Sequence, residues 1–177
     1  PPAESYCLKS VSTNYHNAYH RGRAYTGSDG WASKYDITEG FAKSTFSTQQ
    51  NITFNISQLE NTSVDAQLTV RLSTGSGSHE LSLSLNNTTL LTETFSGWDV
   101  RDIIVNIPTS QLQNGNNTIK IEGTASEEDK FRLVSYELTY PRALNFQNEA
   151  TYEFSLAPDN TSRLLTINNF DFNGSAP

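Results

Sequence analysis

The sequence predicts an all-β protein, an antiparallel, jelly-roll-like β-sandwich with very little helix. Three observations lead to this fold class: apolar and polar residues alternate through most of the chain, turn-forming residues separate the alternating runs, and convincing helical periodicity is absent. Alternation buries one face of each strand and leaves the other in water, as in antiparallel sheets packed face to face. We therefore expect about eight or nine strands.

The predicted strands are recognised by large apolar residues two positions apart. After Leu133 the apolar positions change phase, which predicts a β-bulge or bend. Residues 108–112 favour one short helical turn. Turn-forming residues lie between the strands, at 73–78, 86–87, 96–97, 114–116 and 157–160. The apolar positions are, in chain order, Ile52, Phe54 and Ile56; Ala66, Leu68, Val70 and Leu72; Leu81, Leu83 and Leu85; Ile103, Val105 and Ile107; Ile119 and Ile121; Val134, Tyr136, Leu138 and Tyr140; Tyr152, Phe154 and Leu156; Leu165 and Ile167.

Residues 1–48 differ from the rest of the chain. Aromatic residues are dense there, glycines punctuate them, and alternation is weak. We expect an aromatic, Gly-rich segment that wraps the sandwich and contributes one or two edge strands, whereas residues 49–177 form the β-sandwich itself. No change in composition marks a second domain, so one domain is expected overall.

Composition excludes several classes of protein. A net charge of −7 and a pI near 4.9 leave no basic face for a nucleic acid. No run of about 18–20 apolar residues predicts a membrane span. The single Cys7 cannot close an internal disulfide or build a Cys-rich zinc site. Abundant Asn and Thr with little Lys indicate an exported protein, extracellular or on the cell surface. The chain opens with Pro-Pro and lacks Met, so we interpret it as part of a longer polypeptide.

No catalytic or metal site is predicted, and no cofactor is expected. His16 and His20 have the spacing of ligands on a helix, but Asn17 stands where a zinc peptidase needs Glu, and the surroundings disfavour helix. We expect both to be solvated loop residues. Cys7 is expected to be a buried thiol rather than a nucleophile. The acidic run 127–129 is interpreted as a solvated turn.

The two tryptophans are candidate binding residues. Trp98 lies in a Ser-Gly-Trp-Asp turn and Trp31 follows a glycine. Exposed Trp or Tyr rings stack on the apolar faces of sugars, so a carbohydrate-binding module that uses Trp31, Trp98 or the N-terminal tyrosines is one hypothesis. The alternative is that both tryptophans are hydrophobic plugs at the ends of the sandwich.

Several motifs, in order, resemble a known family. Residues 133–142 resemble the strand ending in Tyr-Pro-Arg that precedes the peptidase domain of gingipain-like cysteine peptidases, in particular the PorU-like sortases of type IX secretion. The runs 79–86, 95–97 and 112–119 are similar to that family's β-sandwich. Upstream, 33–41 resembles the segment that introduces the sandwich, with Thr38 where Gly is frequent, and downstream 165–170 resembles the strand before the junction to the catalytic domain.

The resemblance implies a non-catalytic accessory domain in an exported, sortase-like peptidase. The family's catalytic Cys and His belong to a separate domain, and no residue here matches them, so none is carried over. The implied partners are the downstream peptidase domain of the same polypeptide and, beyond it, secreted protein substrates or glycans. Carbohydrate-binding sandwiches share part of this motif order, so that hypothesis stays open.

Arg142 is the third candidate binding residue. Pro141 lacks the N–H that a central strand needs, so the buried face ending in Tyr140 is expected to stop there and Arg142 to emerge at a sandwich edge. Its guanidinium suits a carboxylate or backbone carbonyls. It either fixes the next loop or contacts the peptidase domain, and in both cases removing it is expected to cost this chain under about 1 kcal/mol.

Overall fold

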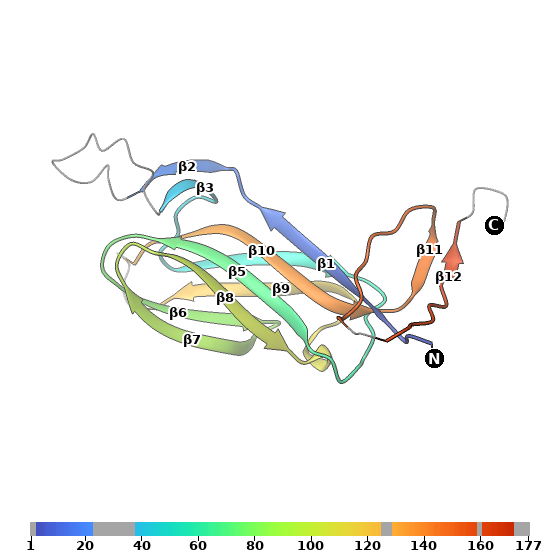
Figure 1. Ribbon diagram of the computed structural model, residues 1–177. Helices are drawn as coiled ribbons and strands as arrows, with labels where there is room; N and C mark the ends of the chain where they lie inside the picture. The colour runs from blue at the N-terminus through green and yellow to red at the C-terminus, as the bar shows by residue number, and fades with distance from the viewer. Residues whose placement is uncertain (1–2, 23–37, 125–128, 159–160, 172–177) are drawn as a thin grey trace.

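The computed structural model describes residues 3–22, 38–124, 129–158 and 161–171. Two four-stranded antiparallel sheets pack face to face, with orders β1-β10-β5-β8 and β4-β9-β6-β7 (Figure 1). Counted along the chain, the eight strands follow the jelly-roll order, so the predicted fold class is confirmed. They are β1 (Cys7–Asn14), β4 (Gln49–Ile56), β5 (Ala66–Thr74), β6 (Ser78–Leu85), β7 (Thr88–Ser96), β8 (Val100–Ile107), β9 (Gly115–Gly123) and β10 (Phe131–Arg142).

Smaller elements lie at the two ends of the sandwich. An antiparallel ribbon of β2 (Ala18–Arg21) and β3 (Glu39–Ala42) lies near one end, and a parallel pair of β11 (Asn145–Glu149) and β12 (Asn168–Phe170) lies beyond the other (Figure 1). The helical turn predicted at 108–112 is the short 3₁₀ helix Thr109–Gln111. Among the described residues, no helix has the length and hydrophobicity needed to cross a membrane.

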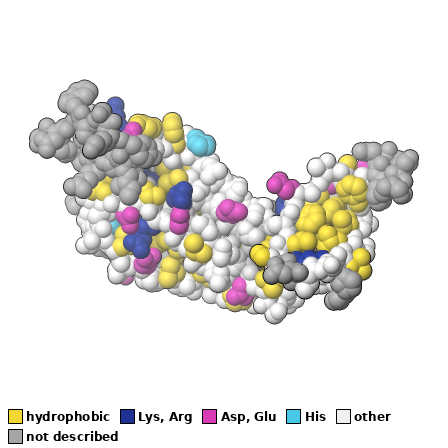
Figure 2. Space-filling view, viewed as in Figure 1, with side chains coloured by type: hydrophobic (Ala, Val, Ile, Leu, Met, Phe, Trp, Pro, Cys, Tyr) yellow, Lys and Arg dark blue, Asp and Glu magenta, His cyan; other side chains and the backbone are white. Residues whose placement is uncertain are grey.

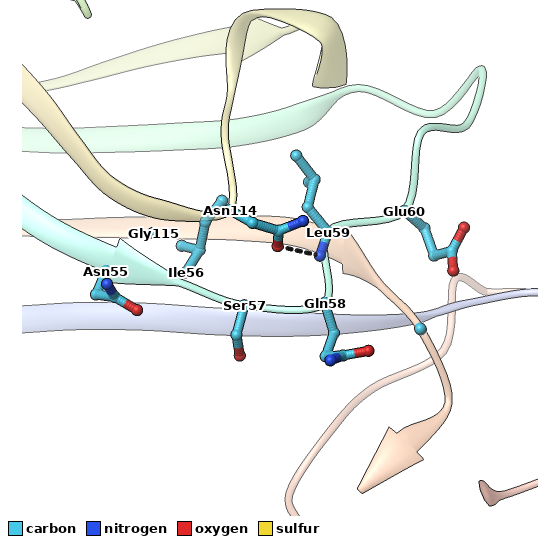
Figure 3. Close-up of a pocket in the computed structure, with 9 residues that line it drawn as sticks. Asn55, Ile56, Ser57, Gln58, Leu59, Glu60, Asn114 and Gly115 are labelled. Atoms are coloured by element: carbon cyan, nitrogen blue, oxygen red, sulfur yellow. Dashed lines mark hydrogen bonds between the residues drawn. The ribbon is translucent and has the colours of Figure 1, made fainter. Parts of the chain in front are cut away.

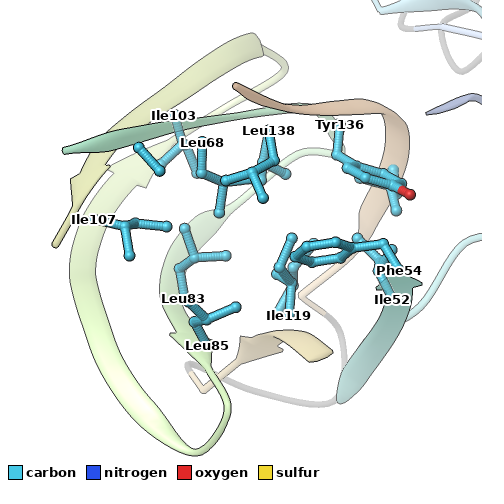
Figure 4. Packing of buried hydrophobic residues seen from close by; sticks show 14 of the residues in the cluster. Ile52, Phe54, Leu68, Leu83, Leu85, Ile103, Ile107, Ile119, Tyr136 and Leu138 are labelled. Atoms are coloured by element: carbon cyan, nitrogen blue, oxygen red, sulfur yellow. The ribbon is translucent and has the colours of Figure 1, made fainter. Parts of the chain in front are cut away.

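The core lies between the sheets and is built from the alternating residues. In Figure 4, Leu68, Ile103 and Leu138 from one sheet face Leu83 and Ile119 from the other. All the predicted apolar positions from Ile52 to Ile121 are buried except Val105, which is partly exposed. The period of two therefore predicts the core correctly, because each strand has one buried and one solvated face.

β10 is the long strand between β1 and β5. A register shift between Leu133 and Ser135 confirms the predicted bulge. Pairing with β5 ends at Thr139, but β10 continues through Pro141, opposite Leu8 of β1. The N–H and C=O of Leu8 point away from β10, so Leu8 and Pro141 form a non-hydrogen-bonded pair. In such a pair the backbone groups of Pro141 face away from β1, so its lack of an N–H removes no hydrogen bond to β1. The prediction that the face stops at Pro141 is therefore wrong.

The final described residues form a second, smaller cluster, the C-terminal lobe (residues 144–158 and 161–171). Its buried centre is Leu144 and Phe146, against which Cys7 also packs. The alternating runs at 152–156 and 165–167 were predicted as sandwich strands, and this is wrong. Tyr152, Phe154, Leu156 and Leu165 instead pack around the lobe's centre, whereas Ile167 is exposed. Alternation indicates a shared buried face but not which core that face belongs to.

One end of the sandwich holds a buried, hydrogen-bonded His–Asp pair. His79 Nδ1 bonds Asp129 Oδ1, and neither side chain is exposed to solvent. His79 Nε2 lies 3.1 Å from the carbonyl oxygens of Gly75 and Gly97, so both ring nitrogens face hydrogen-bond acceptors. Asp129 Oδ2 also accepts the backbone N–H of Glu80. The interpretation of Asp129 as part of a solvated turn is wrong; residues 127 and 128 lie outside the described residues.

We predict that Asp129→Ala destabilises the protein by about 3 kcal/mol, because it leaves buried His79 Nδ1 and the N–H of Glu80 without their hydrogen-bond acceptor. Urea denaturation measures the loss. Asp102→Ala is the matched control: its bidentate ion pair with Arg71 is largely exposed, so it should cost under about 1 kcal/mol. Equal losses of unfolding free energy in the two variants would show that the buried pair stabilises the protein no more than an exposed ion pair does.

Candidate functional site

The structure does not assemble the residues weighed as metal ligands or nucleophile. Among the described residues, no group of three or more His, Cys, Asp or Glu side chains is placed to hold a metal. His16 is exposed, whereas His20 donates from Nε2 to the carbonyl oxygen of Lys43 at 3.1 Å. Burial lowers the pKa of His20, so its ring is neutral at neutral pH. The two histidines thus do not converge, and His20 is not the solvated residue expected.

Cys7 is fully buried, as expected. Its thiol donates to the carbonyl oxygen of Arg142 at 3.5 Å, and burial raises the pKa of the thiol. A raised pKa keeps the group as the unreactive thiol at neutral pH. Cys7 is therefore a packing residue at the junction between the sandwich and the C-terminal lobe.

Arg142 is the centre of that junction. Only 3% of it is exposed, so the prediction that it emerges at an edge is wrong. Its Nε donates to the carbonyl oxygen of Ser57 at 3.2 Å, and one terminal nitrogen donates to Gln147 Oε1 at 3.0 Å. The guanidinium carbon lies 4.5 Å from the centre of the Tyr152 ring. Arg142 therefore joins the β4–β5 connection to two residues of the lobe. Of the two kinds of partner expected for its guanidinium, a carboxylate or a backbone carbonyl, the structure shows the backbone carbonyl.

A polar hollow of about 470 Å³ opens beside this junction. In Figure 3 the side chains of Asn55, Ser57, Gln58 and Glu60 point to one side of the β4–β5 connection. The connection is fixed to the β8–β9 loop by a hydrogen bond, in which Asn114 Oδ1 accepts the N–H of Leu59 at 2.8 Å. The hollow thus presents amide, hydroxyl and carboxylate groups next to the lobe.

The lobe itself carries a large apolar surface. Figure 2 shows hydrophobic side chains gathered over it, in contrast to the mostly polar sandwich. Tyr152, Phe154 and Phe170 are only partly buried around Phe146, and Ile167 is 42% exposed. An apolar surface of this kind, rimmed by polar groups, is typical of an interaction site.

At the opposite end, the β2–β3 ribbon exposes two aromatic rings. Tyr19 is 51% and Phe41 53% exposed, and their rings meet edge to face with centroids 5.4 Å apart. His16 lies against the other side of Phe41, at 6.1 Å. The N-terminal tyrosines were predicted as candidates, whereas Phe41 was missed, because strand alternation in so short a ribbon does not tell which face is covered.

The ribbon overhangs a hollow of about 220 Å³ that is polar on one wall. His20 and Glu39 come from the ribbon, and Arg71 and Val100 from the sheet beneath it. The hydrogen bonds to Asp102 raise the pKa of Arg71 and lower that of Asp102, so both are charged at neutral pH. Rings next to hydrogen-bonding groups are the elements that a sugar site needs.

Trp98, a predicted site residue, lies at this same end. It is half-buried in the turn between β7 and β8, and the Arg132 guanidinium carbon lies 5.8 Å from its ring centre. Arg132 also donates to Thr45 Oγ1 and to the carbonyl oxygen of Thr74, both at 3.3 Å. Trp31, the other tryptophan, lies outside the described residues, so its role stays a prediction.

Comparison with known proteins supports the fold. No family model and no curated protein matches the sequence. Among solved structures, the chain is similar to dimeric latent PorU from Porphyromonas gingivalis, with a TM-score of 0.59 and 12% identity. The match covers 81% of this chain but only 13% of the PorU chain. This likeness therefore establishes a shared β-sandwich over a small part of a longer protein.

Two carbohydrate-binding modules are also similar, at lower scores. The carbohydrate-binding module CBM36 in complex with calcium and xylotriose has a TM-score of 0.43 and 15% identity, over 72% of this chain and 98% of that one. A family 35 module from Clostridium thermocellum has a TM-score of 0.38 and 15% identity, over 75% and 90%. Scores this low carry no argument about a binding site.

We predict that Arg142→Ala destabilises this chain by about 2–3 kcal/mol, because it removes two charge-assisted hydrogen bonds and the contact with Tyr152. This replaces the smaller cost expected for an exposed arginine. Urea denaturation measures the loss. The stability of Arg142→Lys should lie between that of the unmodified chain and that of Arg142→Ala, since lysine keeps the charge but not the forked guanidinium. A loss under about 1 kcal/mol would contradict the joining role.

Proposed function

We propose that this chain is a non-catalytic interaction domain of an exported protein, the accessory β-domain of a gingipain-like cysteine peptidase of the type IX secretion sortase kind. The domain packs against the peptidase domain of the same polypeptide and helps to present secreted protein substrates to it. It acts outside the cell or at the cell surface and has no peptidase activity of its own.

Two independent observations support this proposal. The ordered motifs from residue 33 to residue 170 resemble the sandwich and junction of that family. The chain also shares its fold with a small part of PorU, which is a much longer protein. Among the described residues, the buried His79–Asp129 pair is the one that most resembles catalytic geometry, but His79 Nε2 faces two carbonyl oxygens and no nucleophile.

The observation that carries the proposal is the apolar surface of the C-terminal lobe. Its aromatic side chains are half-exposed around Phe146, and Arg142 fixes the lobe to the sandwich. A pre-formed apolar surface needs little reordering on docking, which suits a permanent contact with a neighbouring domain. The polar hollow next to it supplies hydrogen-bonding groups for the rim of such an interface.

A second candidate function is carbohydrate binding at the ribbon end. The specific observation in its favour is the exposed Tyr19–Phe41 ring pair above a hollow lined by His20, Glu39 and Arg71. A pyranose would stack its C–H face on the rings and place its hydroxyls over the polar wall. The two functions use opposite ends of the sandwich, so each can be tested without disturbing the other.

We predict that Ile167→Lys weakens binding of this chain to the separately produced peptidase domain by at least about tenfold, because it places a charge in the apolar surface of the lobe. Calorimetric titration measures the affinity. Ile104→Lys is the matched control, since Ile104 is 59% exposed on β8, at the far edge of its sheet from β1. Equal weakening by both variants, or no binding by the unmodified chain, contradicts the docking proposal.

We predict that Phe41→Ala abolishes any polysaccharide binding found on a glycan array, because the stacking surface is lost. Trp98→Ala should leave it intact, since Arg132 already lies over that ring. Loss of binding with Trp98→Ala alone would move the sugar site to the β7–β8 turn. An array without any binding removes the second function and leaves the first unaffected.

A further inference from the structure

The outer edge of β1 has unused backbone hydrogen-bonding groups. β1 pairs with β10 in unbroken register from Cys7 to Asn14, and the other edge of β1 borders no strand of its sheet. Leu8 directs its N–H and C=O outward, so the backbone groups of Ser10, Ser12 and Asn14 point the same way by the period of two. Within the described part of the chain, these three residues have no backbone partner on that side.

The chain itself shows that this edge accepts a strand. The N–H of Leu8 donates to the carbonyl oxygen of Ser155 at 2.7 Å, and the N–H of Ser155 donates back at 3.0 Å, an antiparallel pair. The pairing stops after this one residue. The carbonyl oxygen of Glu153, two residues before Ser155, accepts a hydrogen bond from Lys9 Nζ at 3.0 Å instead of from the β1 backbone. The segment that contains Glu153 thus departs from the edge of β1. Leu8 is thus capped while the rest of β1 stays open.

A groove separates the open edge from the departing segment. It has a volume of about 320 Å³, with Leu8, Ser10 and Ser12 on one side and Glu153 and Phe154 on the other. From Ser10 to Asn14 the strand has none of the features that protect natural edges: no proline, no lysine and no register shift. The small serine side chains leave the backbone accessible to another strand.

Charge indicates what kind of segment fits. The Lys9 ammonium is engaged by the Glu153 carbonyl and by the Tyr152 ring, 4.7 Å from its centre. The exposed Glu153 side chain forms no ion pair with any described residue, and the chain as a whole carries a charge of −7. The groove therefore favours a segment with basic side chains.

We propose that β1 binds an extended, basic segment of a partner polypeptide by strand addition, in line with the Leu8–Ser155 pair and opposite Ser10, Ser12 and Asn14. The segment supplies alternating N–H and C=O groups to the edge and directs lysine or arginine side chains to Glu153. The site borders the lobe, which contributes Glu153 and Phe154 to the groove, but its hydrogen-bonding groups belong to β1. The proposal therefore does not depend on the functions proposed for the lobe surface and the aromatic ribbon.

The test uses a blocked hexapeptide of alternating threonine and lysine as the probe, titrated into the whole chain and followed by amide hydrogen exchange and calorimetry. The probe should bind and protect the amides of Ser10 and Ser12, which exchange freely without it. Ser12→Pro should weaken binding at least about tenfold, because it removes an outward donor without touching the β10 ladder. Ser12→Ala is the matched control and should bind as the unmodified chain does.

Glu153→Lys tests the charge without altering the edge, since the carboxylate is exposed. It should weaken the lysine probe and strengthen a matched hexapeptide of alternating threonine and glutamate. The proposal is overturned if the lysine probe fails to bind, if it binds Ser12→Pro as tightly as Ser12→Ala, or if protection appears without probe together with dimer formation. The last result would mean that a second copy of the chain occupies the edge.

Discussion

Strand β10 must hydrogen-bond along both of its edges, and the arrangement of the other strands follows from this requirement. β1 covers one edge over eight residue pairs and β5 covers most of the other. Where β5 ends, the β4–β5 connection continues along this edge: the N–H of Glu60 donates to the carbonyl oxygen of Pro141 at 3.1 Å, and Leu59 forms an antiparallel bridge with Arg142. β10 can therefore extend beyond β5 and carry Arg142 out of the main core to the base of the lobe.

The two ends of the sandwich are closed by different chemistry. At one end, His79 and Asp129 are hydrogen-bonded to each other and fully buried, and the His79 ring contacts the rings of Phe95 and Phe131. At the other, Arg142 forms no ion pair with a carboxylate among the described residues and is held by a carbonyl, an amide and a ring. The second end thus keeps a positive charge beside an apolar surface, which suits it to contact a partner.

Much of the fold could be predicted from the sequence, but less of the candidate sites. Alternation identified the core from Ile52 to Ile121 and the bulge after Leu133, because both depend on local periodicity. It could not separate the lobe from the sandwich, nor show that Asp129 meets His79 from fifty residues away. Gly123 is a similar case: a Cβ there would lie 2.5 Å from the Phe131 ring, a contact that no spacing in the sequence reveals.

The pairing of the first strand with the last strand of the sandwich links folding to the length of the chain. Cys7 pairs with Arg142, a separation of 135 residues, so β1 can pair only after β10 has been synthesised. A nascent chain that ends before residue 131 has no β10, which leaves β1 and one edge of β5 unpaired. The first sheet of this domain therefore cannot close until residues 131–142 have been synthesised, and until then the inner edges of β1 and β5 are open to pairing with other chains.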